Sequence, residues 1–130
     1  MVYNALAGIA VGYALGMTDD QIKAGIEALV PLAGRNNLIE TGKFTVIDDC
    51  YNANPVSMKS SIDVLKKADT RTVAVLGDMF ELGDNEKAMH FDVGVHAAKS
   101  GVDVLICIGA LSEEMAKGAR ETNAEMEIHH

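Results

Sequence analysis

A chain of 130 residues is long enough for one ordinary domain, or for one domain and part of a second. With 48% hydrophobic and 23% charged residues, its composition is that of a globular protein and excludes a disordered one. Eleven basic and 19 acidic residues give a net charge of −8 without any basic cluster, so we expect no nucleic-acid partner.

Residues 2–15 predict a helix that is apolar on nearly every face. Such a helix should be buried on more than one side, and the following helix alone cannot provide that much surface. We therefore infer that the chain begins inside a larger protein. The apolar stretch is shorter than the roughly 20 residues of a membrane span. Asn4 interrupts it and no basic segment precedes it, so we expect a cytoplasmic protein with no membrane partner.

A second helix is predicted to begin at residues 18–19, where a threonine or aspartate can act as the N-cap. Its buried stripe should comprise Ile22, Ile26 and Leu29. Pro31 and Gly34 then break the helical pattern. We place a domain boundary there, which separates residues 1–33 from residues 34–130.

The next two segments, residues 35–40 and 43–47, flank a short glycine turn and predict a β-hairpin. The second arm runs directly into Asp48 and Asp49, and Asn54 then caps a helix that opens with proline. A strand that ends in polar groups beside a helix N-terminus is a place where α/β proteins bind ligands.

Two further apolar runs, residues 72–77 and 102–108, predict strands buried on both faces. Helices are expected to follow, capped by Asp84 and by Ser112, and a last strand is expected at residues 125–128. The predicted buried face of the first of these helices comprises Ala88, Phe91, Val95 and Ala98.

This alternation of strands and helices predicts an α/β fold, with a Rossmann-like, mostly parallel sheet and helices on both faces. The sequence contains neither G-x-G-x-x-G nor G-x-x-x-x-G-K-[ST], so it encodes no phosphate cradle of either common type.

Cysteine and histidine residues give no metal or redox pattern. Cys50 and Cys107 lie in or beside apolar strands and are predicted to be packed, reduced thiols. His90 and His96 fall within a predicted helix without metal-ligand partners, so packing or surface roles are expected for both.

Two longer motifs carry a family resemblance. Residues 48–57, D-D-C-Y-N-A-N-P-V-S, resemble the D-D-S-Y-N-A-N-P-x-S signature of the Mur ligases that add D-alanyl-D-alanine to the UDP-N-acetylmuramoyl tripeptide. Residues 76–83, L-G-D-M-F-E-L-G, resemble that family's L-G-D-M-x-E-L-G. Residues 4–7 and 34–35 resemble its N-A-x-A segment and the G-R at its domain junction. Cys50 stands where the family usually has serine.

The resemblance implies part of a three-domain, ATP-dependent, ADP-forming amide ligase of peptidoglycan synthesis. Residues 1–33 would be the C-terminal helices of its central ATP-binding domain, and residues 34–130 would be most of its Rossmann-like C-terminal domain. ATP and Mg would be the cofactors. The P-loop, the Mg ligands and the family's carbamylated lysine would lie outside this chain, so we expect the chain alone to be inactive. D-alanyl-D-alanine and the UDP-N-acetylmuramoyl tripeptide would be the partners of the intact enzyme.

The resemblance also assigns site residues, although it assigns neither a catalytic residue nor a metal ligand within this chain. Asn4 would lie against the adenine, Arg35 would reach the phosphates and Asp49 would accept hydrogen bonds from the ribose hydroxyls. The remaining candidates are Tyr51, Asn52 and Asn54 on the nucleotide and hinge side, and Asp78 and Glu81 at the cleft.

Two alternatives belong to other classes. The acidic pair at residues 48–49 together with Asp78 is also a feature of phospho-acceptor receiver domains, but those need a lysine after a later strand, and residues 108–111 provide none. The other is a non-catalytic binding module, which would not require Arg35, Asp49 and their polar neighbours to converge on one edge of the sheet.

Overall fold

The computed structural model describes residues 2–30 and 32–130. It divides into two compact units, Met1–Leu32 and Ala33–His130. The division falls one residue before the predicted boundary between residues 33 and 34.

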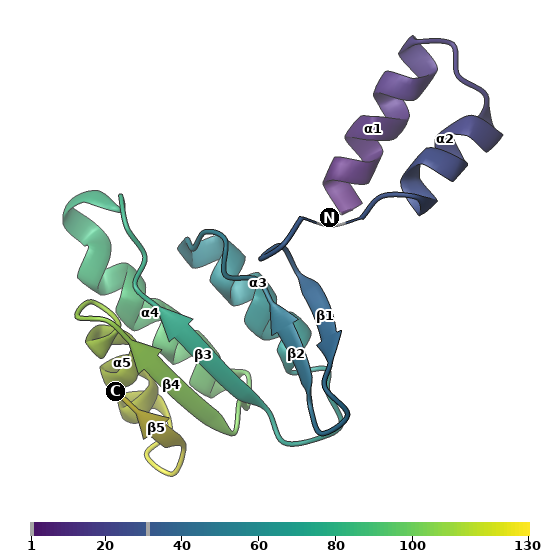
Figure 1. Cartoon of the computed structure of the whole chain (residues 1–130). Helices are drawn as coiled ribbons and strands as arrows, with labels where there is room; N and C mark the ends of the chain where they lie inside the picture. Colours follow the sequence, from purple (N-terminus) through teal and green to yellow (C-terminus); the bar gives the residue numbers. More distant parts are fainter. Residues whose placement is uncertain (1, 31) are drawn as a thin grey trace. The chain divides into compact units, whose positions relative to one another are not determined.

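The first unit is a helical hairpin of α1 (Val2–Ala14) and α2 (Asp19–Glu27) (Figure 1). Thr18 caps α2 in a capping box: its backbone N–H donates to Gln21 Oε1 at 2.9 Å, and its hydroxyl accepts from the Gln21 N–H. The two helices approach closely at Gly12, where a Cβ atom would lie 2.7 Å from Ile22 Cγ1.

Most apolar side chains of this unit are exposed within the chain. Ile22 is buried at 7% exposure, but Ile26 reaches 36% and Leu29, which lies beyond the end of α2, reaches 63%. The predicted stripe is therefore correct at Ile22 and wrong at Ile26 and Leu29. Leu29 lies outside the helix because α2 ends at Glu27, and Ile26 is exposed although it lies within α2. Within the described residues, no helix has both the length and the apolar character needed to cross a membrane.

The second unit has the predicted α/β fold. Its elements are β1 (Asn37–Glu40), β2 (Thr45–Asp48), α3 (Pro55–Leu65), β3 (Val73–Gly77), η1 (Gly83–Asn85), α4 (Glu86–Lys99), β4 (Val104–Ile108), α5 (Glu113–Thr122) and β5 (Glu127–His129). The predicted hairpin is confirmed, since β1 and β2 pair antiparallel. Strands β3, β4 and β5 form a parallel sheet in that order.

The strands differ from the predicted arrangement in one respect. The sequence predicts a single mostly parallel sheet, whereas the described strands form a two-stranded sheet, β1-β2, and a separate three-stranded sheet, β3-β4-β5. The helix α3 connects the two sheets without bringing β2 and β3 into backbone pairing. The local strand pattern cannot specify this, because it contains no information on which strand edges meet.

Helices α4 and α5 lie behind the three-stranded sheet in Figure 1 and pack tightly on each other. A Cβ atom at Gly94 would overlap the carbonyl group of Met115, and one at Gly118 would overlap that of Phe91. The two glycines thus allow the helix backbones to approach. The buried residues of α4 are His90, Val93, Gly94, Ala97 and Ala98.

The predicted buried face of α4 is therefore mostly wrong. Ala88 is exposed, Phe91 and Val95 are half-buried, and Ala98 alone of the four predicted positions is buried. The close contact through Gly94 rotates the buried face toward α5, and no apolar periodicity signals a glycine contact.

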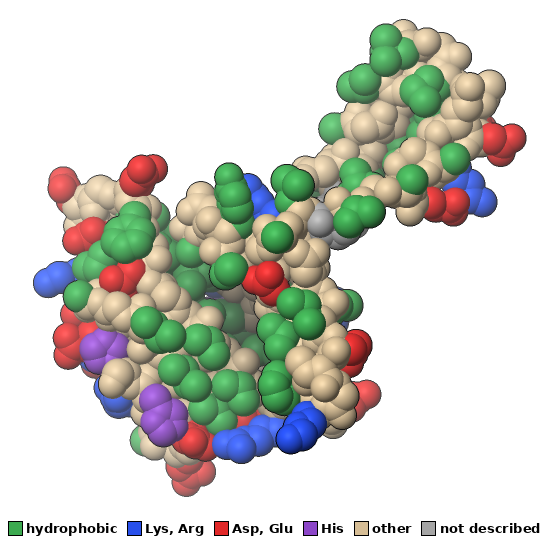
Figure 2. Space-filling model, in the orientation of Figure 1, with side chains coloured by type: hydrophobic (Ala, Val, Ile, Leu, Met, Phe, Trp, Pro, Cys, Tyr) green, Lys and Arg blue, Asp and Glu red, His purple; other side chains and the backbone are tan. Residues whose placement is uncertain are grey.

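The helix-free face of the three-stranded sheet is exposed along β3 and at the end of β4, although Val104 on that face is buried. Val73, Val75 and Ile108 are 45%, 58% and 60% exposed, whereas Ala74 and Leu105, which face the helices, are 4% and 0% exposed. Figure 2 shows hydrophobic side chains gathered over β3 and β4 on this face. Burial on both faces, as predicted for these strands, is therefore not found for β3. The predicted placement of helices on both faces is also wrong for the three-stranded sheet in the described part of the chain, because α4 and α5 cover one face and the other is helix-free.

Candidate functional site

The segment after β2 is held against residues 34–36 by three hydrogen bonds. Asp48 Oδ2 accepts from the Gly34 N–H at 3.2 Å, and Asp49 Oδ1 accepts from the Asn36 N–H at 3.1 Å. The Tyr51 N–H donates to the Gly34 carbonyl oxygen at 3.0 Å. These bonds bring the start of the second unit beside the carboxyl end of β2.

Gly34 is required at this junction for two reasons. Its φ of +71° lies in the left-handed region, which residues other than glycine rarely adopt. A Cβ atom there would also lie 3.2 Å from the Tyr51 backbone nitrogen. The glycine of the G-R pair therefore has a backbone role that places the arginine next to it.

Arg35 and Tyr51 come together at this junction. The guanidinium carbon of Arg35 lies 4.0 Å from the centroid of the Tyr51 ring, a cation–π contact. Both residues are exposed, Tyr51 to 66%. The stacking holds a positive charge at the surface beside the end of β2, where an anionic ligand can reach it.

Asp49 is fixed between two elements. The Asp49 Oδ1 atom accepts from the Asn36 N–H, and the Asp49 Oδ2 atom accepts from the Ser61 hydroxyl of α3 at 2.6 Å. The carboxylate is half-buried and its orientation is set from both sides. Its lone pairs are not exhausted by these two bonds, because a carboxylate offers about four acceptor positions.

The two asparagines of the motif have different surroundings. Asn54 is the N-cap of α3, and its Oδ1 accepts from the N–H groups of Val56 and Ser57 at 3.1 and 2.9 Å. The predicted capping role is thereby confirmed. Asn52 is exposed, and its Oδ1 accepts from the Ala53 N–H.

Asp78 joins the ends of two parallel strands. It follows β3, and its Oδ1 accepts from the Ser112 N–H at 2.7 Å, at the start of α5. Gly109, with φ +118°, makes room for this carboxylate. Ser112 occupies the predicted N-cap position, but its hydroxyl donates to the Gly109 carbonyl oxygen and makes no side-chain cap.

Glu81 lies in the loop between β3 and η1. Its side chain is exposed, and its φ of +61° is in the left-handed region. A non-glycine residue in this conformation is uncommon and occurs preferentially at functional sites. Asp84, three residues further on, lies inside η1, and α4 begins without a side-chain cap, so the predicted capping role of Asp84 is wrong.

The prediction of two packed thiols is half correct. Cys107 is buried, and burial raises its pKa to about 11. Cys50 is exposed instead of packed. A hydrogen bond with the Asp48 carboxylate, with its negative charge, raises the pKa of the Cys50 thiol.

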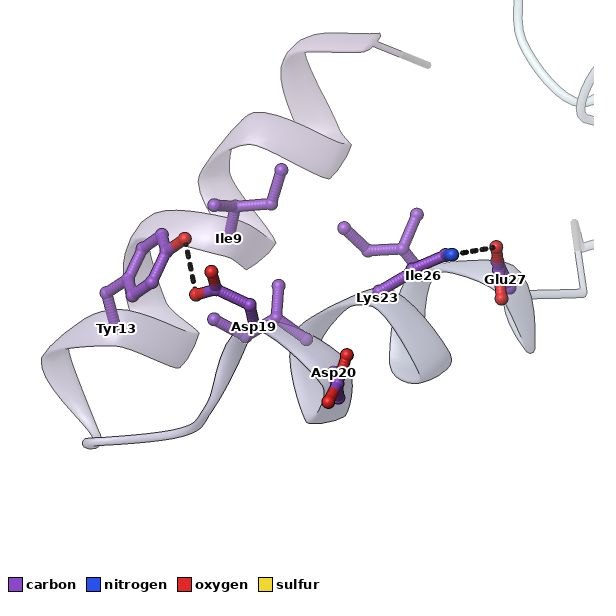
Figure 3. A pocket seen from close by; sticks show the side chains of 8 residues that line it. Ile9, Tyr13, Asp19, Asp20, Lys23, Ile26 and Glu27 are labelled. Carbon is purple, nitrogen blue, oxygen red and sulfur yellow. Dashed lines mark hydrogen bonds and ion pairs between the residues drawn. The ribbon is translucent and has the colours of Figure 1, made fainter.

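The first unit contributes Asn4, which is exposed on α1. The helices α1 and α2 of this unit also border a shallow groove, whose lining includes Ile9, Tyr13, Asp19 and Ile26 (Figure 3). The Tyr13 hydroxyl donates to Asp19 Oδ1 at 3.0 Å, which raises the Tyr13 pKa. Nothing in the sequence predicted this groove.

Sequence reasoning missed three groups that shape these sites: Ser61, Ser112 in its bond to Asp78, and His90, which bonds to the backbone of Met79. A serine on the inner face of α3 carries no pattern of its own. Among the described residues, no group of three or more His, Cys, Asp or Glu residues is arranged to hold a metal ion.

Residues 34–130 match the family model described as "Mur ligase, glutamate ligase domain". The chain belongs to the Mur ligase family. The family resemblance predicted from the motifs is thus confirmed, and membership decides against the receiver-domain alternative.

The relatives of this Mur ligase chain are much longer than the chain itself. It is 37% identical over 116 residues to the UDP-N-acetylmuramoyl-tripeptide--D-alanyl-D-alanine ligase of Escherichia coli, covering 88% of this chain and 26% of the relative. It is 33% identical to the ligase of the same name from Bacillus subtilis, covering 99% and 29%.

A crystal structure of MurF from Acinetobacter baumannii superimposes with a TM-score of 0.87 at 33% identity, covering 98% of this chain and 28% of that one. The likeness extends over both units of the chain. This Mur ligase chain therefore spans between a quarter and a third of the length of the proteins it matches.

Proposed function

We propose that this chain is part of an ATP-dependent ligase that joins D-alanyl-D-alanine to the UDP-N-acetylmuramoyl tripeptide in peptidoglycan synthesis. The observation that carries the proposal is the 33–37% identity, over 88–99% of the chain, to ligases named for that reaction. Both substrates and ATP are cytoplasmic metabolites of such a pathway, so we place the protein in the cytoplasm.

The junction at the end of β2 fits a nucleotide. Arg35 offers an exposed guanidinium that is already oriented by Tyr51, and a planar fork of this kind suits phosphate oxygens. Asp49 retains acceptor positions for hydroxyl groups while Asn36 and Ser61 hold it in place. We assign Arg35 to the phosphates and Asp49 to the ribose of ATP.

The other candidates support this arrangement. Tyr51 and Asn52 present an exposed ring and an exposed amide on the same segment as Asp49. Asn54 acts through the cap of α3, which fixes where that segment ends. Asn4, in the first unit, is assigned to the adenine, and Asp78 and Glu81 are assigned to the substrate side of the cleft.

When bound, ATP would supply a phosphoryl group to activate the peptide carboxylate, with ADP as the leaving group, and the amine of D-alanyl-D-alanine would then form the amide as inorganic phosphate leaves. This chain would contribute positioning and positive charge, which reduce the barrier to such a transfer. We assign the Mg ligands and the phosphate cradle to the remainder of the longer protein, and therefore expect no ligation by this chain alone.

The test is phosphate release by the longer protein, supplied with ATP, magnesium, UDP-N-acetylmuramoyl tripeptide and D-alanyl-D-alanine. Release that requires all components supports the proposal. Release that is absent with every tripeptide, or ligation by the 130-residue chain alone, would contradict it.

The role of Arg35 is tested in the same assay. Arg35→Ala should raise the KM for ATP about tenfold or more, as expected when a charged hydrogen bond is lost. Arg71→Ala is the matched control, because Arg71 is also exposed but pairs with Glu127 at 2.7 Å, away from this segment. Equal effects of the two substitutions would refute the assignment.

A further inference from the structure

His90 is the most completely enclosed titratable side chain among the described residues that no assigned role uses. It lies on α4 with 0% exposure. Its Nε2 accepts from the Met79 N–H at 2.9 Å, and its Nδ1 lies 2.6 Å from the Glu86 carbonyl oxygen. One ring therefore connects the first turn of α4 to the loop that follows β3.

These two partners fix the state of the ring. A backbone N–H can only donate, so Nε2 must present a lone pair to Met79. A carbonyl oxygen can only accept, so Nδ1 must carry the proton that is donated to Glu86. The geometry requires a neutral imidazole in the Nδ1–H form.

The loop that His90 holds is residues 78–83, which contains Asp78 and Glu81. Met79 is 0% exposed and belongs to the core, so its bond to His90 anchors the loop from inside. The bond from Ser112 to Asp78 holds the start of the loop. Glu81 then adopts its left-handed conformation two residues beyond the buried anchor.

We propose that His90 is a positioning residue: as the neutral Nδ1–H tautomer it locks residues 78–83 into the one conformation that presents Glu81 outward. The Glu81 side chain is exposed, so burial among the described residues does not fix its direction. The direction of the Glu81 side chain therefore depends on the backbone conformation of residues 78–83, which the hydrogen bond between Met79 and His90 holds in place. The part of the inference that concerns catalysis rests on the proposed ligase function, whereas the part that concerns the ring and the loop does not.

The first test is long-range ¹H–¹⁵N correlation NMR of the 130-residue chain at pH 7.5. We expect His90 to show an unprotonated Nε2 and a protonated Nδ1. The opposite tautomer, or two protonated nitrogens, would overturn the inference, and this measurement needs no variant.

The second test compares His90→Gln with His90→Asn by hydrogen exchange. The Gln side chain can place an oxygen near the position of Nε2 and accept from Met79, whereas Asn reaches the position of Nδ1. After correction for global stability, the Met79 amide should exchange about tenfold faster in His90→Asn than in His90→Gln, the factor for one hydrogen bond. Equal protection in both variants would overturn the inference.

His96→Gln is the matched control, because His96 lies on the same helix with a side chain that is 30% exposed and bonded to Asp63. It should leave Met79 exchange unchanged. In the longer protein, His90→Asn should lower kcat about tenfold, with His90→Gln restoring most of it and the KM for ATP unchanged. Absence of ligase activity in the wild-type longer protein would refute the proposed function alone. An active wild type with unaltered kcat in His90→Asn would refute the positioning role.

Discussion

The close approach of α4 and α5 makes Gly94→Ala the sharpest test of the packing. The added Cβ atom would overlap the Met115 carbonyl oxygen and lie 2.6 Å from its carbon, whereas ordinary contacts are 3.4–4 Å. The obstacle is backbone, so no side-chain rotation can relieve it, and the helices must separate by roughly an ångström. Overpacking of this kind costs about 3 kcal/mol at the upper end of the usual range.

A gain in helix propensity of about 1 kcal/mol opposes this cost, which leaves a net destabilisation of about 2 kcal/mol. For a unit of this size the midpoint of thermal unfolding should fall by roughly 8–16 °C. The assay is thermal and urea unfolding followed by far-UV circular dichroism, with hydrogen exchange of α4 peptides to assign the transition to the second unit.

The matched control is Gly25→Ala in α2, where a Cβ atom would meet nothing within 4 Å. It should be neutral or stabilise its own unit by up to about 1 kcal/mol. Gly118→Ala should repeat the loss, because it brings a Cβ atom against Phe91. An unchanged or raised midpoint for Gly94→Ala would refute the reasoning and mean that the two helices lie further apart.

Three further results are expected. Asn54→Ala should destabilise the second unit by about 1 kcal/mol in urea unfolding, because alanine cannot cap α3. Asn54→Ser should be nearly neutral, because serine can still act as the cap. Equal losses of stability in the two variants would contradict the capping role. Hydrogen bonds from Thr72 lower the pKa of Asp103, so this carboxylate stabilises the fold above the ordinary value of 3.8 and loses that contribution as the pH falls through its lower native pKa. Asp103→Asn should therefore flatten the acid limb of stability against pH, and an unaltered limb would count against it. Thiol labelling at pH 8 should modify the exposed Cys50 at less than the rate of a free thiol and leave the buried Cys107 unmodified until denaturant is added; labelling of Cys107 in native protein would show that the core opens.

The sequence by itself determined the features that depend on neighbours within a few residues. The capping box of Thr18 and the cap by Asn54 are local hydrogen bonds, and both are present. The hairpin turn is local as well, with Gly42 at φ +80°. The two motifs also identified the Mur ligase family, because a run of eight or more residues in order is specific without any structure.

Tertiary structure decided the contacts that join distant residues. Asp48 and Asp49 accept from backbone groups 14 and 13 residues away, which no strand pattern could indicate. The buried face of α4 follows a glycine contact with α5 and not the apolar period of the helix. In the sequence, nothing distinguishes His90 from other histidines in helices. In the structure its side chain is buried, and both ring nitrogens form hydrogen bonds with backbone groups. Local chemistry fixes which element forms, but the partner of each polar group depends on which elements meet.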